Sequence, residues 1–220
     1  MNYRPAAPGD REELLRLWRE AFSEDGSWFF RSIAAQGWCA DDGDGLRAMA
    51  FAVDQWLVTA TEQRPVAYVY AVATQREFRG KGLATALFQT MEDSLRRQGA
   101  VGTILVPATP GLFRLYEKMG YGIWACRPAD TPGEEPGEPC SAAEYLALRQ
   151  TYLTPPYVQP DESILRLYRL YRSGSGIHAV DAAGRTAERL PAVGGGVPFA
   201  MAKALTDDFP QKGYFAFAME

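Results

Sequence analysis

Histidine and cysteine are scarce in this chain of 220 residues. His178 is the only histidine, and the three cysteines (Cys39, Cys126 and Cys140) lack the spacing of a metal-binding or redox motif. A histidine-rich metal site is therefore excluded, and we expect no metal cofactor. An odd number of widely spaced cysteines also fits a reducing cytoplasm better than a secreted, disulfide-bonded domain.

Long apolar runs and an excess of basic residues are absent too. No segment is apolar for long enough to span a bilayer, and the start, Met1 to Pro5, does not resemble a signal peptide. We therefore expect a cytoplasmic protein without a membrane partner. The net charge of −4 argues against a nucleic-acid partner. Apolar residues at 47% and charged residues at 23% are usual for a globular chain of one large or two small domains.

The most informative segment, Val72 to Ala84, joins an apolar strand to an amphipathic helix through a basic turn. The first N–H groups of a helix have no intrahelical partner and carry partial positive charge. Gly80 and Gly82 let a phosphate approach the backbone with no Cβ in the way. Positively charged side chains lie around the same point: Arg76, Arg79 and Lys81. These residues predict a pyrophosphate-binding turn.

Spacing separates this turn from other phosphate-binding turns. A P-loop needs Ser or Thr after Gly-Lys, whereas Gly80-Lys81 is followed by Gly82-Leu83. The three glycines and the later acid of the dinucleotide fingerprint are also missing. Residues 79–84 read Arg-x-x-Gly-x-Ala, which resembles the coenzyme A-binding motif of the GNAT (GCN5-related N-acetyltransferase) superfamily.

A second motif supports this resemblance. Gly111 to Gly122, GLFRLYEKMGYG, is similar to the late helix of the superfamily and follows the first motif at the family's separation. The resemblance covers about residues 1–127. Thr74 and the lead-in Pro107 to Gly111 resemble the enhanced-intracellular-survival type of acetyltransferase.

The resemblance implies an α/β (α+β) protein with the GNAT acyl-CoA N-acyltransferase fold, a mixed central sheet flanked by helices, over residues 1–127. Residues 128–140 are rich in proline, glycine and acids and are interpreted as a linker. Residues 141–220 are expected to form a small α+β extension, interpreted as a degenerate half of a second GNAT unit. Its expected elements are helices at 141–151, 161–171 and 199–205, strands on both sides of 181–184, and a last strand at 214–219.

The resemblance also implies the activity: transfer of the acetyl group of acetyl-CoA, a cosubstrate, to a primary amine by direct attack in a ternary complex. It assigns the pyrophosphate to the backbone N–H groups of Arg79, Gly80, Lys81, Gly82, Leu83 and Ala84. It assigns the pantetheine arm to the backbone of Val72, Ala73 and Thr74. In this family the strand bulges, and an N–H near Val72 faces the thioester carbonyl as an oxyanion donor.

Two side chains complete the implied site. Tyr116 stands where the superfamily has the general acid, and a phenol is protonated at neutral pH and can protonate a departing thiolate. Thr109 stands where many members have an asparagine that holds the pantetheine, so this contact departs from the family pattern. The general base stays open among Glu24, Asp25, Asp54, the terminal carboxylate of Glu220 and a water chain.

The acceptor is also open. It is a small-molecule or peptidic amine, and the aromatic segment Trp28 to Phe30 either lines its site or belongs only to the core. The protein is expected to be a monomer or a homodimer. A non-catalytic CoA-binding sensor or scaffold is the alternative function, and a nucleotide-binding module is a second.

Overall fold

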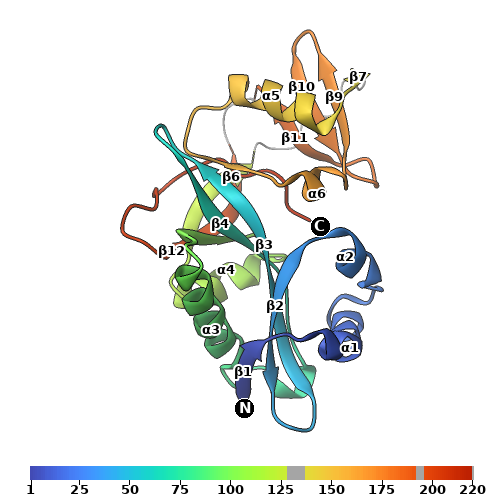
Figure 1. The fold of residues 1–220 in the computed structure, drawn as a ribbon, viewed down its shortest axis with the longest axis vertical. Coiled ribbons are helices and arrows are strands. Elements are labelled where there is room, and N and C mark those ends of the chain that lie inside the picture. Colours follow the sequence, from blue (N-terminus) through green and yellow to red (C-terminus); the bar gives the residue numbers. More distant parts are fainter. Residues whose placement is uncertain (128–136, 192–195, 220) are drawn as a thin grey trace. The chain divides into compact units, whose positions relative to one another are not determined.

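The computed structural model describes residues 1–127, 137–191 and 196–219 (Figure 1). Most of the interpreted linker and Glu220 lie outside these ranges. The chain divides into two compact units. The first consists of Met1–Asp54, Pro65–Leu105 and Lys203–Phe209, and the second of Gln55–Arg64, Val106–Ala202 and Pro210–Glu220. The domain boundaries expected from the sequence stay a prediction.

The first unit is built on a mixed sheet. Its strands are β1 (Asn2–Pro5), β2 (Ala35–Asp41), β3 (Leu46–Val58), β4 (Gln63–Thr74) and β5 (Gly102–Leu105), and β3 and β4 continue into the second unit. The strands are neighbours in the order β1-β2-β3-β4-β5. The β1–β2 and β2–β3 pairs are antiparallel, and β4 and β5 are parallel. A mixed sheet is what the resemblance implies.

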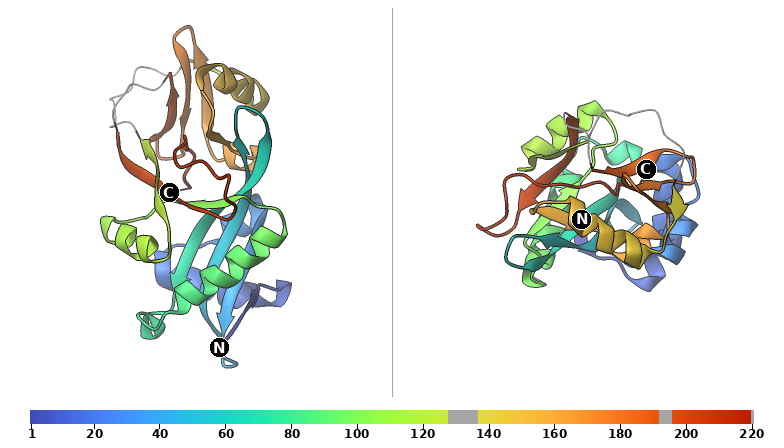
Figure 2. Two further views of the ribbon diagram at one scale, coloured as in Figure 1. Left: turned by 90° about the vertical axis from the view of Figure 1, so that its left-hand side faces the viewer. Right: turned by 90° about the horizontal axis from the view of Figure 1, so that it is seen from above.

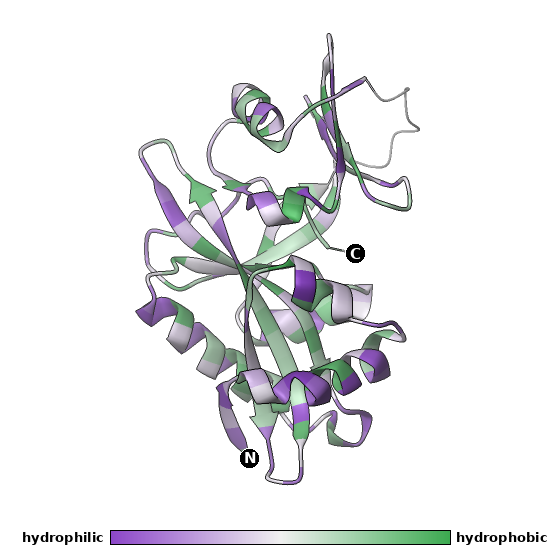
Figure 3. Cartoon of the chain, turned by 45° about the vertical axis from the view of Figure 1, so that its right-hand side comes forward, coloured by the Kyte–Doolittle hydropathy of each residue, from purple (hydrophilic) through white to green (hydrophobic). Residues whose placement is uncertain are grey.

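Helices cover both faces of this sheet. They are η1 (Pro8–Asp10), α1 (Arg11–Phe22), α2 (Ser27–Ser32), η2 (Arg76–Phe78) and α3 (Leu83–Arg97). α1 and α2 lie on one face and α3 on the other (Figure 1; Figure 2, left). Buried apolar side chains form the core of this unit. Hydrophobic and hydrophilic residues alternate along its helices (Figure 3). None of the helices in the described ranges combines the length and apolar composition that a bilayer crossing requires.

The second unit contains a separate antiparallel sheet and several shorter elements. These are α4 (Pro110–Lys118), β6 (Gly122–Arg127), β7 (Glu138–Pro139), α5 (Ala142–Tyr152), β8 (Tyr157–Gln159), α6 (Glu162–Leu165), β9 (Arg169–Ser173), β10 (Gly176–Val180), β11 (Thr186–Leu190) and most of β12 (Val197–Ala204). The separate sheet has the order β11-β10-β9-β7. β12 pairs with β6, and β8 pairs with the end of β3.

Three expectations for the tail are wrong. The helix expected at 161–171 ends at Leu165, and Arg169–Ser173 is instead a strand that pairs with β10 across the turn at 173–176. The helix expected at 199–205 lies largely within β12, which pairs with β6. The strand expected at 214–219 does not form, and only Tyr214 makes an isolated bridge, with Tyr157. In the first two cases backbone pairing outweighs the local propensity for helix.

A buried ion pair lies inside the second unit. Arg149 on α5 and Glu188 on β11 are both fully buried, and Nε of Arg149 donates to both carboxylate oxygens at 2.9 and 3.0 Å. The Tyr145 hydroxyl donates to the same carboxylate at 2.9 Å, and burial together with this negative charge raises the pKa of Tyr145. The aromatic rings around the guanidinium are those of Tyr157, Tyr214 and Phe217, with centroids 5.4 to 5.8 Å away. The pair therefore connects α5 and β11 to the C-terminal segment.

Candidate active site

Strand β4 carries a backbone irregularity shortly before the glycine-containing turn that leads into α3. Ala71 has φ +50°, one of the few non-glycine residues with a positive φ among the described residues, and it is 7% exposed. Left-handed backbone costs an L-residue about 1–2 kcal/mol. Such strain persists only where the surrounding structure holds it, and it is commonly found at functional sites. The conformation lies one residue before Val72, where the resemblance implies a bulge.

β4 also continues beyond its pairing with β5. The parallel register joins Ala67 to Thr103 and Tyr68 to Ile104, whereas β4 runs on to Thr74. From Tyr70 the side chains alternate between half-buried and buried, so Tyr70, Val72 and Thr74 are accessible in part. The end of β4 therefore extends past its parallel neighbour, an arrangement in which an extended ligand can lie beside the strand.

The turn after β4 presents open backbone. Gly80 and Gly82 have φ +76° and +80°, and a Cβ added to either would meet no heavy atom within 4 Å. α3 begins at Leu83, and Gly82 provides no side-chain cap. Within the described part of the chain, the N–H groups of residues 80–84 have no hydrogen-bond acceptor. This combination suits a phosphate group, which accepts hydrogen bonds from a helix N-terminus.

Basic side chains surround the turn. Arg76, Arg79 and Lys81 are exposed. Nε of Arg79 donates to the carbonyl oxygen of Thr74 at 3.0 Å, which fixes this side chain across the turn. Nζ of Lys81 lies 4.8 Å from the ring centroid of Phe78. The positive charge expected at this place is therefore present.

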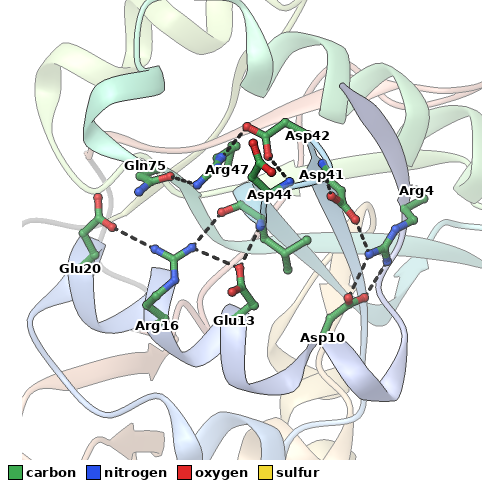
Figure 4. A network of polar contacts seen from close by, with 12 residues as sticks. Arg4, Asp10, Glu13, Arg16, Glu20, Asp41, Asp42, Asp44, Arg47 and Gln75 are labelled. Carbon is green, nitrogen blue, oxygen red and sulfur yellow. Dashed lines mark hydrogen bonds and ion pairs between the residues drawn. The ribbon is translucent and has the colours of Figure 1, made fainter.

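A polar network holds the start of the turn in place (Figure 4). The N–H of Gln75 donates to the carbonyl oxygen of Arg47 at 2.8 Å, and Nη1 of Arg47 donates to the Gln75 side chain at 3.0 Å. The N–H of Arg76 donates to Glu20 on α1 at 3.0 Å. Asp42 accepts from Nε of Arg47 at 2.7 Å, and this contact lowers the pKa of Asp42. β3 and α1 thus position the residues that enter the turn.

The strain at Ala71 gives a stability prediction. Replacing Ala71 with valine puts a β-branched side chain at positive φ, and we expect it to cost about 1–2 kcal/mol more than Ala73→Val. Both alanines are buried, at 7% and 6% exposure, so the second variant controls for overpacking. The measurement is urea unfolding followed by fluorescence. Equal losses for the two variants would contradict the assignment of strain to Ala71.

Thr109 and Tyr116 belong to the second unit. Thr109 is exposed and is the N-cap residue of α4, without a side-chain capping bond. Tyr116, on the same helix, is 7% exposed and packs edge-on against Tyr121 with ring centroids 5.9 Å apart. Burial raises the pKa of Tyr116 to about 12. This hydroxyl therefore stays protonated throughout the physiological range.

The candidate bases have different surroundings. Asp25 accepts hydrogen bonds from the N–H and hydroxyl of Ser27, at 3.2 and 2.8 Å, in the loop before α2. Glu24 accepts from Nε1 of Trp18 at 3.1 Å. Asp54 is exposed on β3. In the described ranges, no group of three or more acidic, histidine or cysteine side chains is arranged to hold a metal ion.

Comparison with known families decides the identity of the fold. The sequence profile of the acetyltransferase (GNAT) domain matches residues 2–124, more than half of the chain. The chain belongs to the GNAT acetyltransferase family. The superfamily and the fold class expected from the sequence are confirmed.

Several known proteins are similar to part or most of this GNAT chain. It is 33% identical over 130 residues to a mycothiol acetyltransferase of Nocardia farcinica, covering 53% of this chain and 43% of the relative. Its fold resembles Eis1 from Mycobacterium abscessus, with TM-score 0.62, 14% identity and coverage of 86% and 59%. A GCN5-related N-acetyltransferase from Kribbella flavida gives TM-score 0.57, 19% identity and coverage of 82% and 54%. The chain thus spans about half the length of these relatives.

Several residues around the site were not found from the sequence. Arg47, Gln75 and Glu20 support the turn from other elements, and no local motif marks them. Tyr70 lies beside the strained Ala71, but a tyrosine in an apolar strand carries no signal of its own. Phe29 belongs to the core, at 1% exposure, while Trp28 and Phe30 are half-buried. The aromatic segment therefore contributes to the core and is also partly accessible to solvent.

Proposed function

We propose that this GNAT chain transfers the acetyl group of acetyl-CoA to a primary amine of a small molecule or peptide, in a ternary complex. One observation carries the proposal: the strained end of β4, the open turn and the uncapped N-terminus of α3 follow one another directly along the chain. The family membership supports it, and so does the acetyl transfer in the name of the mycothiol acetyltransferase relative.

The turn suits the pyrophosphate of acetyl-CoA. The N–H groups of residues 80–84 point to no acceptor within the described residues, and the glycines leave the approach open. In the proposed complex, the backbone of Val72, Ala73 and Thr74 binds the pantetheine arm alongside β4. Thr109 contributes a hydroxyl contact to the same arm. The Val72 N–H, next to the strained Ala71, donates to the thioester oxygen as negative charge develops there.

The reaction balances without a metal or an oxidant. The amine nitrogen forms a bond to the acetyl carbon, and the carbon–sulfur bond breaks. The amine loses a proton to a base or to water, and Tyr116 donates a proton to the leaving sulfur. The products are an amide and free CoA. A phenol whose pKa is about 12 is almost entirely protonated at neutral pH, which is the state that a general acid requires.

Removing the phenol tests this assignment. We expect Tyr116→Phe to lower kcat about a hundredfold while the Kd for acetyl-CoA is unchanged, because the acid acts on the leaving group alone. The measurement is thiol release from acetyl-CoA over a panel of amines. Because the pKa of Tyr116 is raised to about 12, the wild type should not lose activity through this group as pH rises to 10.

The neighbouring tyrosine provides a matched control. Tyr121 is buried against Tyr116, at 3% exposure, and Tyr121→Phe removes a hydroxyl from the same surroundings. We expect Tyr121→Phe to keep most of the wild-type kcat. Full activity of Tyr116→Phe would remove Tyr116 from the mechanism.

A further inference from the structure

An aromatic cluster of the first unit joins the end of β4 to the loop between α1 and α2. Its rings belong to Trp18, Phe22, Trp28, Phe29, Phe30, Phe51 and Tyr70. Trp18, Phe29 and Phe51 are buried and form its inner part. Phe22 is 40% exposed, and Trp28, Phe30 and Tyr70 are half-buried. The outer part of the aromatic cluster is therefore accessible to a ligand.

One carboxylate is fixed to this cluster. Oε1 of Glu24 accepts a hydrogen bond from Nε1 of Trp18 at 3.1 Å, although Glu24 is exposed. Gly26 packs so closely on the Trp18 indole that a Cβ would overlap the ring, which holds the loop down. Burial and the nearby charge of Glu24 raise the pKa of Tyr70 to about 12. Glu24 and Tyr70 both contact Trp18, the first through a hydrogen bond and the second through ring packing.

Tyr70 places the cluster beside the proposed reaction centre. Its ring packs on Phe29 with centroids 5.4 Å apart and on Trp18 at 6.0 Å. Along the chain it precedes Ala71 and stands two positions before Val72, so its Cα lies within about 7 Å of the Val72 Cα. A group bound on the accessible rings is therefore close to the backbone that would hold the thioester.

The accessible rings and the Glu24 carboxylate favour the binding of a positively charged group. Aromatic faces attract ammonium groups, and a carboxylate pairs with them. Arg11 already lies over Phe30, 5.5 Å from its centroid, so the rings left for a ligand are those of Phe22, Trp28 and Tyr70. Within the described residues Oε2 of Glu24 accepts no hydrogen bond, and it is available to a ligand.

We propose that the acceptor carries at least two amino groups, and that Glu24 and the accessible rings bind one of them as an ammonium while the other attacks the thioester. The reason is chemical. An attacking amine must be neutral, whereas an ammonium paired with a carboxylate keeps its proton, so the anchored group and the reacting group are different. This inference rests on the proposed acetyl transfer and names the class of its acceptor.

Binding of amines, measured apart from acetyl transfer, tests the inference. Spermidine, a lysine-containing peptide and kanamycin each carry several amines, and butylamine carries one. Each is titrated calorimetrically into the wild type and into Glu24→Gln, with CoA present instead of acetyl-CoA so that no turnover occurs. We expect at least one polyamine to bind the wild type more tightly than butylamine, and to lose about tenfold or more in affinity in Glu24→Gln.

Glu12→Gln is the matched control, since Glu12 is an exposed glutamate of α1, the helix that precedes the Glu24 loop. Glutamine keeps an oxygen for Nε1 of Trp18, so the cluster should stay folded. In turnover, Glu24→Gln should raise the KM for the amine with kcat nearly unchanged. The inference would be overturned if Glu24→Gln and the wild type bound polyamines with equal affinity, or if the wild type bound no polyamine. It would also be overturned if Glu24→Gln lowered kcat at constant KM. Failure of acetyl-CoA to bind would instead count against the proposed function.

Discussion

Gly82→Asp is expected to abolish measurable binding of acetyl-CoA, whereas the wild type is expected to bind it with a micromolar Kd. The new carboxylate would lie at the N-terminus of α3, where the pyrophosphate is proposed to bind. Two like charges about 4 Å apart near a protein surface repel by about 4 kcal/mol, which corresponds to a roughly thousandfold loss of affinity. Calorimetric titration with acetyl-CoA measures the effect directly.

The fold should survive this substitution. Aspartate adopts left-handed backbone more readily than most L-residues, so the strain at φ +80° should cost α3 no more than about 1–2 kcal/mol. Gly99→Asp is the matched control, because Gly99 follows the other end of α3, has φ +93° and is equally open to a new Cβ. There the carboxylate lies at the unfavourable end of the helix dipole and far along α3 from the turn. Similar losses of affinity in both variants would show that charge at this turn is not the cause.

Arg149→Met is expected to destabilise the second unit by about 3–5 kcal/mol, because it leaves a buried carboxylate without its counterion. Glu188 would retain the Tyr145 hydroxyl as a donor but lose both bonds from Nε of Arg149. The C-terminal segment would lose the cation that lies 5.6 and 5.8 Å from the ring centroids of Tyr214 and Phe217. Urea unfolding gives the size of the loss. Hydrogen exchange should accelerate in α5 and β11 and stay unchanged in α3.

Two further variants separate charge from packing. The double variant Arg149→Met with Glu188→Leu removes the unpaired charge as well, and it should be more stable than Arg149→Met alone. Arg166→Met, at an exposed arginine of the same unit, should change the free energy of unfolding by less than about 0.5 kcal/mol. A double variant that is less stable than Arg149→Met would contradict the account based on a stranded charge.

The proposed CoA-binding turn was predictable because its determinants are local. Gly80 and Gly82 adopt the left-handed backbone that glycine permits, and α3 follows directly with the expected apolar stripe buried. The exposed basic side chains follow from the sequence too.

Non-local pairing explains the errors in the tail. Residues 161–171 and 199–205 are rich in good helix formers, so periodicity and propensity both favour helices. The Ser-Gly-Ser-Gly segment at 173–176 was the available sign of a hairpin, and β9 also pairs with β7, which lies about thirty residues earlier in the chain. β12 pairs with β6, from a different part of the sequence. Neither partner is visible in a local window.

The sequence by itself determined the family, the strand–turn–helix that presents backbone N–H groups, and the position of Tyr116, because each depends on residues close together in the chain. Only the tertiary structure decided the support of the turn by Arg47 and Glu20, and the placing of Glu24 on the aromatic cluster beside Tyr70. The buried ion pair of Arg149 and Glu188 was likewise decided only by the tertiary structure. The physical reason is that these contacts join side chains from separate elements, and their energies depend on burial and distances that arise only when the elements pack.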